Sequence, residues 1–157
     1  MDKWIRWAVP AAAIAATAAP AYAVQYLSIA DAQKLAFPSA SRFVDSGDGH
    51  AYRAQAGDKL LGLFVVDRVI GKHLYIDYAV ALDPAGRVSR VEILEYRESY
   101  GGEVRSPSWL GQFVGKSNGS ALKVGNDIRN ISGATLSSLH VTEGVKRILT
   151  VYGSRVR

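Results

Sequence analysis

Three consecutive stretches rich in β-branched and aromatic residues occupy the middle of the chain, at residues 60–70, 73–82 and 87–96. Turn-forming residues separate them: Gly71-Lys72 lies between the first two, and Asp83-Pro84-Ala85-Gly86 lies between the second and the third. Such stretches are typical of β-strands. Strands joined by connections this short pair antiparallel, because a parallel return needs a longer crossover. The third stretch alternates only in part, a pattern compatible with a β-bulge.

Apolar residues recur at helical spacing in three other segments. The longest follows Ser137, and we expect Ser137 or Ser138 to cap that helix; its apolar face comprises Val141, Val145, Ile148, Leu149 and Tyr152. Two shorter helices are predicted at residues 28–37 and 106–115, each beginning with a serine that can act as an N-cap. The pattern therefore predicts an α+β fold in which an antiparallel sheet packs against a C-terminal helix and two shorter helices.

The N-terminal 23 residues have the features of a secretory signal. Lys3 and Arg6 precede an alanine-rich apolar run, and Ala21-Tyr22-Ala23 offers a small-x-small cleavage site. We therefore predict a signal at residues 1–23 and one domain at residues 24–157, located in the periplasm or elsewhere outside the cytoplasm. An uncleaved membrane anchor is the alternative, and the shortness of the apolar run disfavours it.

Composition removes several classes of function. The chain has no cysteine, which excludes disulfides, thiolate metal sites, iron–sulfur clusters and c-type haem attachment. Its 3 histidines show no metal-binding spacing, so no metal site is predicted. The net charge is +5, but the basic residues are scattered, which argues against a nucleic-acid partner. A modest positive charge is compatible with an anionic cofactor or an acidic redox partner.

A segment rich in hydroxyl side chains, Ser132-Gly133-Ala134-Thr135-Leu136-Ser137-Ser138, stands where the last predicted helix begins. The first amides of a helix have no intrahelical partner, and with the helix dipole they favour binding of an anion, phosphate above all. The residues alone leave open a simpler interpretation, in which this is a polar helix start that binds no ligand.

The same segment resembles the attachment motif of the FMN-binding domain family, which includes subunits of sodium-pumping and Rnf-type redox complexes and small exported domains. The resemblance implies that Thr135 carries FMN through a phosphoester bond made by a flavin transferase. Neighbouring cofactor-binding residues would be Ser132, Gly133, Ala134, Leu136, Ser137 and Ser138. Glu98, Gly101 and Gly102 resemble a glutamate-and-glycine segment that lies against the flavin in the family. Many members carry an aspartate three positions before the motif's serine, where this chain has Arg129.

The function implied by the resemblance is that of an exported electron carrier rather than a stand-alone enzyme. It would pass electrons from a membrane or periplasmic donor to an extracytoplasmic acceptor. Lys123 or Arg129 would help to offset the phosphate charge, and His140 would face solvent or contact the phosphate or the flavin edge. Two alternatives remain at this point: a flavin-free periplasmic binding module and a noncovalent FMN reductase.

Overall fold

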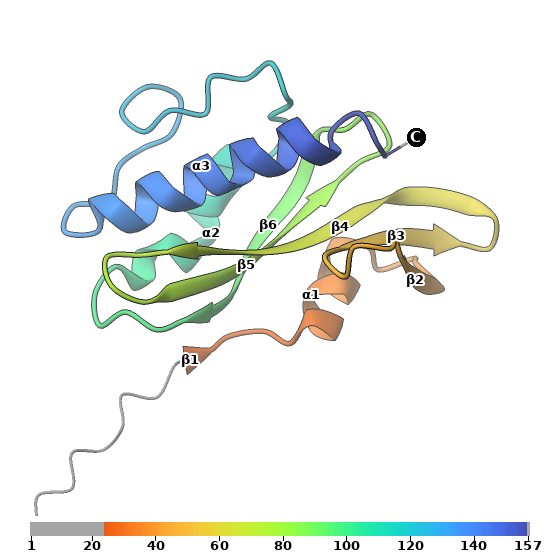
Figure 1. Ribbon diagram of the computed structural model, residues 1–157, viewed down its shortest axis with the longest axis horizontal. Helices are drawn as coiled ribbons and strands as arrows, with labels where there is room; N and C mark the ends of the chain where they lie inside the picture. Colours follow the sequence, from red (N-terminus) through yellow and green to blue (C-terminus); the bar gives the residue numbers. More distant parts are fainter. Residues whose placement is uncertain (1–23, 157) are drawn as a thin grey trace, which may run out of the picture.

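The structure is a computed structural model that describes residues 24–156. The predicted signal at residues 1–23 lies outside the described residues. One six-stranded antiparallel sheet dominates the described part, with strand order β1-β6-β5-β4-β3-β2 (Figure 1). The strands are β1 (Val24–Gln25), β2 (Arg42–Asp45), β3 (Ala51–Ala56), β4 (Lys59–Ile70), β5 (Tyr75–Leu82) and β6 (Val88–Tyr96).

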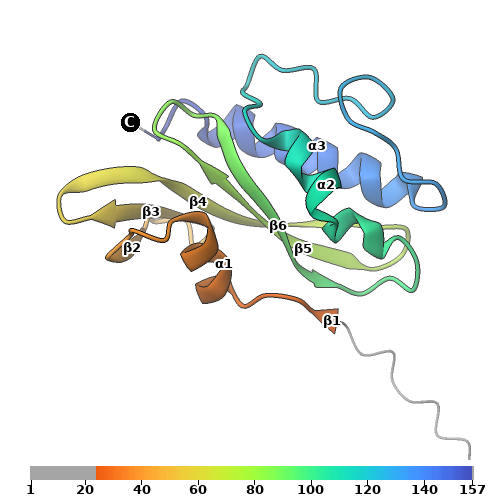
Figure 2. The ribbon, with the colours of Figure 1, turned by 180° about the vertical axis from the view of Figure 1, so that it is seen from behind.

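Helices cover both faces of this sheet. The long helix α3 (Thr135–Tyr152) and the short helix α2 (Pro107–Leu110) lie on one face, and α1 (Ile29–Ala36) lies on the other (Figures 1 and 2). Two 3₁₀ turns, η1 (Gly102–Arg105) and η2 (Gly111–Phe113), flank α2. The predicted α+β architecture is therefore confirmed, including a C-terminal helix and two shorter ones.

The larger core lies between the sheet and α3. Its sheet side includes Val65, Ile76, Tyr78, Val80 and Ile93, and its helical side includes Phe113, Val141, Val145, Ile148 and Leu149. A smaller core under α1 is built from Ala32, Phe37, Ala54, Phe64, Ala79, Ala81 and Leu94. Because successive residues of a strand point to opposite faces, β4 and β5 supply both cores and are apolar on both sides.

The three predicted strands are confirmed as β4, β5 and β6. The expected irregularity is also present, since the pairing register of β5 with β6 shifts at Asp77/Tyr78 and again at Ala81/Leu82. Ser28 caps α1 as expected, and its hydroxyl accepts from the amide of Asp31 at 3.1 Å. The strands β2 and β3 were not predicted.

Candidate functional site

A solvent-open cavity of about 540 Å³ lies beside the first turn of α3. Three segments far apart in the sequence line it: the β4–β5 turn at Lys72 and His73, the segment 98–100 after β6, and the segment 133–137. The volume falls within the range of about 300–1,000 Å³ that is usual for ligand sites. The cavity therefore has room for a ligand of cofactor size.

Thr135 is the first residue of α3, and its exposed side chain lines this cavity. Its hydroxyl accepts a hydrogen bond from the Asn130 side-chain amide at 3.2 Å. The chain turns into the helix through Gly133, whose φ of +79° is in the left-handed region that glycine adopts without strain. The turn thus places the Thr135 hydroxyl at the cavity, beside the neutral amide donor of Asn130.

The predicted N-cap of this helix is wrong. The cap position is occupied by Ala134, no side chain caps the helix, and Ser137 and Ser138 are buried within its first turns. The Ser138 hydroxyl instead donates to the carbonyl of Ala134 at 3.0 Å and accepts from the amide of Ile131 at 3.2 Å. Serine hydroxyls can bond in either way. Because no side chain occupies the cap, the first amides of α3 stay available to an anion at the positive end of the helix dipole.

The segment after β6 packs directly against the start of α3. Gly101 has φ of +86°, and a Cβ there would lie 2.6 Å from both the Ala134 Cβ and the Tyr96 hydroxyl. That hydroxyl also bonds to the carbonyl of Tyr100 and lies 3.3 Å from the Ser137 hydroxyl. The end of β6 and the start of α3 are therefore joined through a contact that only glycine permits.

Glu98 holds the β4–β5 turn. Its Oε1 accepts from the amide of Leu74 at 2.8 Å and from the amide of His73. Burial raises the pKa of the Glu98 carboxyl, but hydrogen bonds from the backbone of this turn lower it by more, so the pKa is below its ordinary value. The carboxylate charge is consequently satisfied by the turn.

His140 holds the same turn from the α3 side. Its Nδ1 lies 2.7 Å from the carbonyl of Ile70, and since a carbonyl only accepts, Nδ1 carries the proton. His140 was expected to face solvent or to contact the phosphate or flavin edge; it is half-buried, and the expected ligand contact remains a prediction. The turn is thereby fixed to both β6 and α3.

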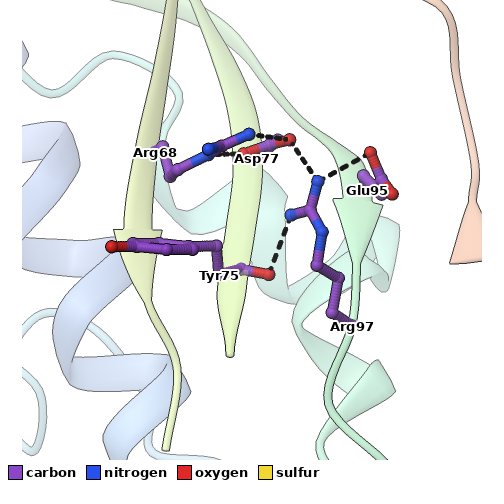
Figure 3. A network of polar contacts seen from close by, with 5 residues as sticks. All are labelled: Arg68, Tyr75, Asp77, Glu95 and Arg97. Atoms are coloured by element: carbon purple, nitrogen blue, oxygen red, sulfur yellow. Dashed lines mark hydrogen bonds and ion pairs between the residues drawn. The ribbon is translucent and has the colours of Figure 1, made fainter. Parts of the chain in front are cut away.

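An ion-pair network stabilises the strand end that leads to Glu98 (Figure 3). Asp77 lies between Arg68 at 2.5 Å and Arg97 at 2.8 Å, and Arg97 also pairs with Glu95 at 2.8 Å. Arg97 donates to the carbonyl of Tyr75 as well. Burial raises the pKa of Asp77, but the two arginines lower it by more, which leaves the pKa below its ordinary value. The network links β4 and β5 with the end of β6, and Arg68, Asp77 and Glu95 line a separate pocket near α1.

The structure brings most of the predicted site residues together. Six of them line the cavity: Glu98, Gly133, Ala134, Thr135, Leu136 and Ser137. Ser138 is buried behind them, and Ser132 is exposed outside the lining. Gly101 and Gly102 line a second cavity, which shares Ser99 and Tyr100 with the first. No observation tests the flavin contacts predicted for these residues, which remain a prediction.

The cationic residues differ from expectation. Arg129 donates to the Ser108 carbonyl at 3.3 Å and to the Gln112 side chain at 3.4 Å, so it is directed to α2, and neither it nor Lys123 is in the cavity lining. Lys72, which the sequence marked only as a turn residue, lines the cavity together with His73. The signal for this lay in strand pairing: Ile76 opposite Tyr96 brings residue 73 close to residue 98.

Residues 24–156 lack two features that would point to other functions. No group of three or more histidine, aspartate or glutamate side chains there could hold a metal ion. No helix of the described part has the length and apolarity needed to cross a membrane.

FMN fits the residues present in the cavity. Its phosphate is an anion that the uncapped amides of α3 can bind, and the Thr135 hydroxyl stands at the same helix end. The open cavity beside them has the volume for a ring system. When bound, FMN would supply the redox chemistry, and the protein would supply orientation and charge.

Comparisons with known proteins bear on the family of the chain. No curated protein sequence matches the chain. Among solved structures the chain is similar to Shewanella oneidensis NqrC, with 18% sequence identity, a TM-score of 0.48, and coverage of 75% of this chain and 67% of that one. The sequence profile described as the FMN-binding domain matches residues 71–150, just over half of the chain, and spans the turn, Glu98 and Thr135. The chain belongs to the FMN-binding domain family, and FMN is its cofactor.

Proposed function

We propose that this protein is an exported electron carrier whose FMN is linked by its phosphate to the Thr135 hydroxyl. One observation carries the proposal: an exposed hydroxyl stands on the first residue of an uncapped 18-residue helix, at the edge of a cavity large enough for a cofactor. A phosphodiester at this position keeps one negative charge, which the first amides of α3 and the helix dipole would offset.

A covalent link suits a protein located outside the cytoplasm. Free FMN is scarce there, and a carrier that bound it reversibly would lose it by mass action. The signal predicted at residues 1–23 supports this location. The proposed partners are a flavin transferase, which makes the link, and a redox protein in the membrane or periplasm.

Intact mass spectrometry tests the link. The chain is coexpressed with a flavin transferase, and we expect its mass to increase by that of FMN less one water. Thr135→Ala abolishes the increase and Thr135→Ser restores it, because only the hydroxyl is needed. Thr150→Ala, at an exposed threonine near the other end of α3, serves as the matched control and keeps it.

Acid precipitation separates the alternatives. Yellow colour that stays in the pellet supports the covalent carrier, whereas colour released to the supernatant indicates a noncovalent FMN reductase. A colourless protein after coexpression indicates a flavin-free binding module. A mass increase that survives Thr135→Ala overturns the assignment of this residue.

A further inference from the structure

We propose that Lys72 stabilises the reduced form of the flavin and so raises the reduction potential of this carrier. The inference rests on the proposed function only in that FMN occupies the cavity beside Thr135. Its argument concerns the residues that face the cavity from the β4–β5 turn.

The position of Lys72 is fixed by the turn that carries it. The amide of Gly71 donates to the carbonyl of Leu74 at 2.7 Å and closes the turn. Glu98 binds the amides on one side of the turn, and His140 binds the carbonyl of Ile70 on the other. Gly71 is buried against Glu98, and a Cβ there would lie 2.9 Å from Oε1 of Glu98. The backbone of Lys72 is thus held from both sides of the turn.

The charge of Lys72 is not neutralised by a neighbour. No ion pair within residues 24–156 includes it. Glu98, the acidic residue of the cavity lining, has its carboxylate engaged by backbone amides of the turn. Among the described residues that line the cavity, Lys72 is the one lysine, and there is no arginine. Its ammonium group can therefore interact with a ligand in the cavity without competition from a neighbouring acid.

Reduction changes the charge of a flavin. Two electrons and one proton convert the neutral oxidised ring to the anionic reduced ring, which carries one negative charge more. A nearby cation interacts more favourably with the anion than with the neutral ring, so it favours reduction. Because Lys72 is solvent-exposed, salt should weaken this effect.

The test is an anaerobic redox titration of the flavin-loaded protein, with dithionite as electron donor and a reference dye. Lys72→Gln is expected to lower the ratio of reduced to oxidised flavin at a given potential about tenfold at low salt. For a two-electron couple this equals about 30 mV. Lys72→Arg keeps the charge and the potential. Lys34→Gln, which removes an exposed lysine on α1 across the sheet, is the control and leaves the potential unchanged.

The mass of each sample separates this inference from the proposed function. If no covalent FMN is found, the titration is made on noncovalently bound FMN, and the effect of Lys72 still decides the inference. An unchanged potential in Lys72→Gln, or an equal shift in Lys34→Gln, overturns the role of Lys72 while leaving the Thr135 link intact. A chain that holds FMN by neither route overturns both.

Discussion

Replacing Gly144 by alanine should loosen the contact between α3 and the sheet. A Cβ at this position would overlap the Tyr78 hydroxyl and lie 2.9 Å from both the Tyr78 Cζ and the Val69 Cγ1. Tyr78 is completely buried, and its hydroxyl donates to Asp67 at 2.9 Å, so the ring has no free space to enter. Overpacking of this kind costs about 1–3 kcal/mol.

The expected net effect is smaller because alanine favours helix formation. That preference contributes about 1 kcal/mol in the opposite direction. Since the obstacle is a rigid buried ring, we place the overpacking cost at the upper end of its range and expect a net loss of about 2 kcal/mol. Urea unfolding of the cofactor-free protein measures it as a lower midpoint at unchanged slope.

Two controls make the result interpretable. The difference between Glu143→Ala and Glu143→Gly, at the neighbouring exposed position, calibrates the helix preference on this helix. Tyr78→Phe removes the atom that would overlap most, so the double variant with Gly144→Ala should lose at least about 1 kcal/mol less than the sum of the single variants. A Gly144→Ala protein as stable as the wild type, or strictly additive losses, would refute the reasoning.

Two further predictions concern a loop carboxylate and the segment after β6. The amide of Lys123, with help from Lys116 and the amide of Leu122, lowers the pKa of Asp127 from 3.8 to about 2. Asp127→Asn should therefore lower the free energy of unfolding by about 1 kcal/mol at neutral pH. This loss relative to wild type should persist above pH 3.8 and disappear as the pH falls to about 2. Unfolding measured across an acid titration checks it. Gly101→Ala should cost about 1–2 kcal/mol and reduce FMN loading, because it adds strain at positive φ and separates the segment from Ala134. Gly115→Ala, which has a similar positive φ but nothing within 4 Å of its added Cβ, is the matched control for both readouts, and equal losses in the two variants would contradict the packing argument.

The central part of the fold was predictable because β4, β5 and β6 are long, apolar and separated by short turns. β2 and β3 lacked those signals. β2 is mostly exposed, and the buried residues of β3 are Ala51 and Ala54, which are small and belong to different cores, so the strand shows no apolar alternation. These strands form because they pair with the edge of the sheet, and such pairing depends on tertiary contacts rather than on local sequence.

The site was predictable where a motif is local and less so where it depends on contacts across the fold. The segment around Thr135 and the segment around Glu98 were named from their resemblance to family motifs, and the structure places both at one cavity. The roles of Lys72 and His140 depend on strand register and on the path of α3, which no local pattern encodes. The cap of α3 was mispredicted because Ser138 can bond backward to Ala134 as well as forward.

The order of the strands has a consequence for how the polypeptide acquires its shape. From β2 to β6 each strand pairs with its neighbour in sequence, so the sheet can grow by local hairpins with little loss of chain entropy. The bond from His140 to Ile70 spans 70 residues, and closing so long a loop is slower. We therefore expect α3 to dock last. A modifying enzyme that needs the finished cavity would meet its threonine only once that docking is complete.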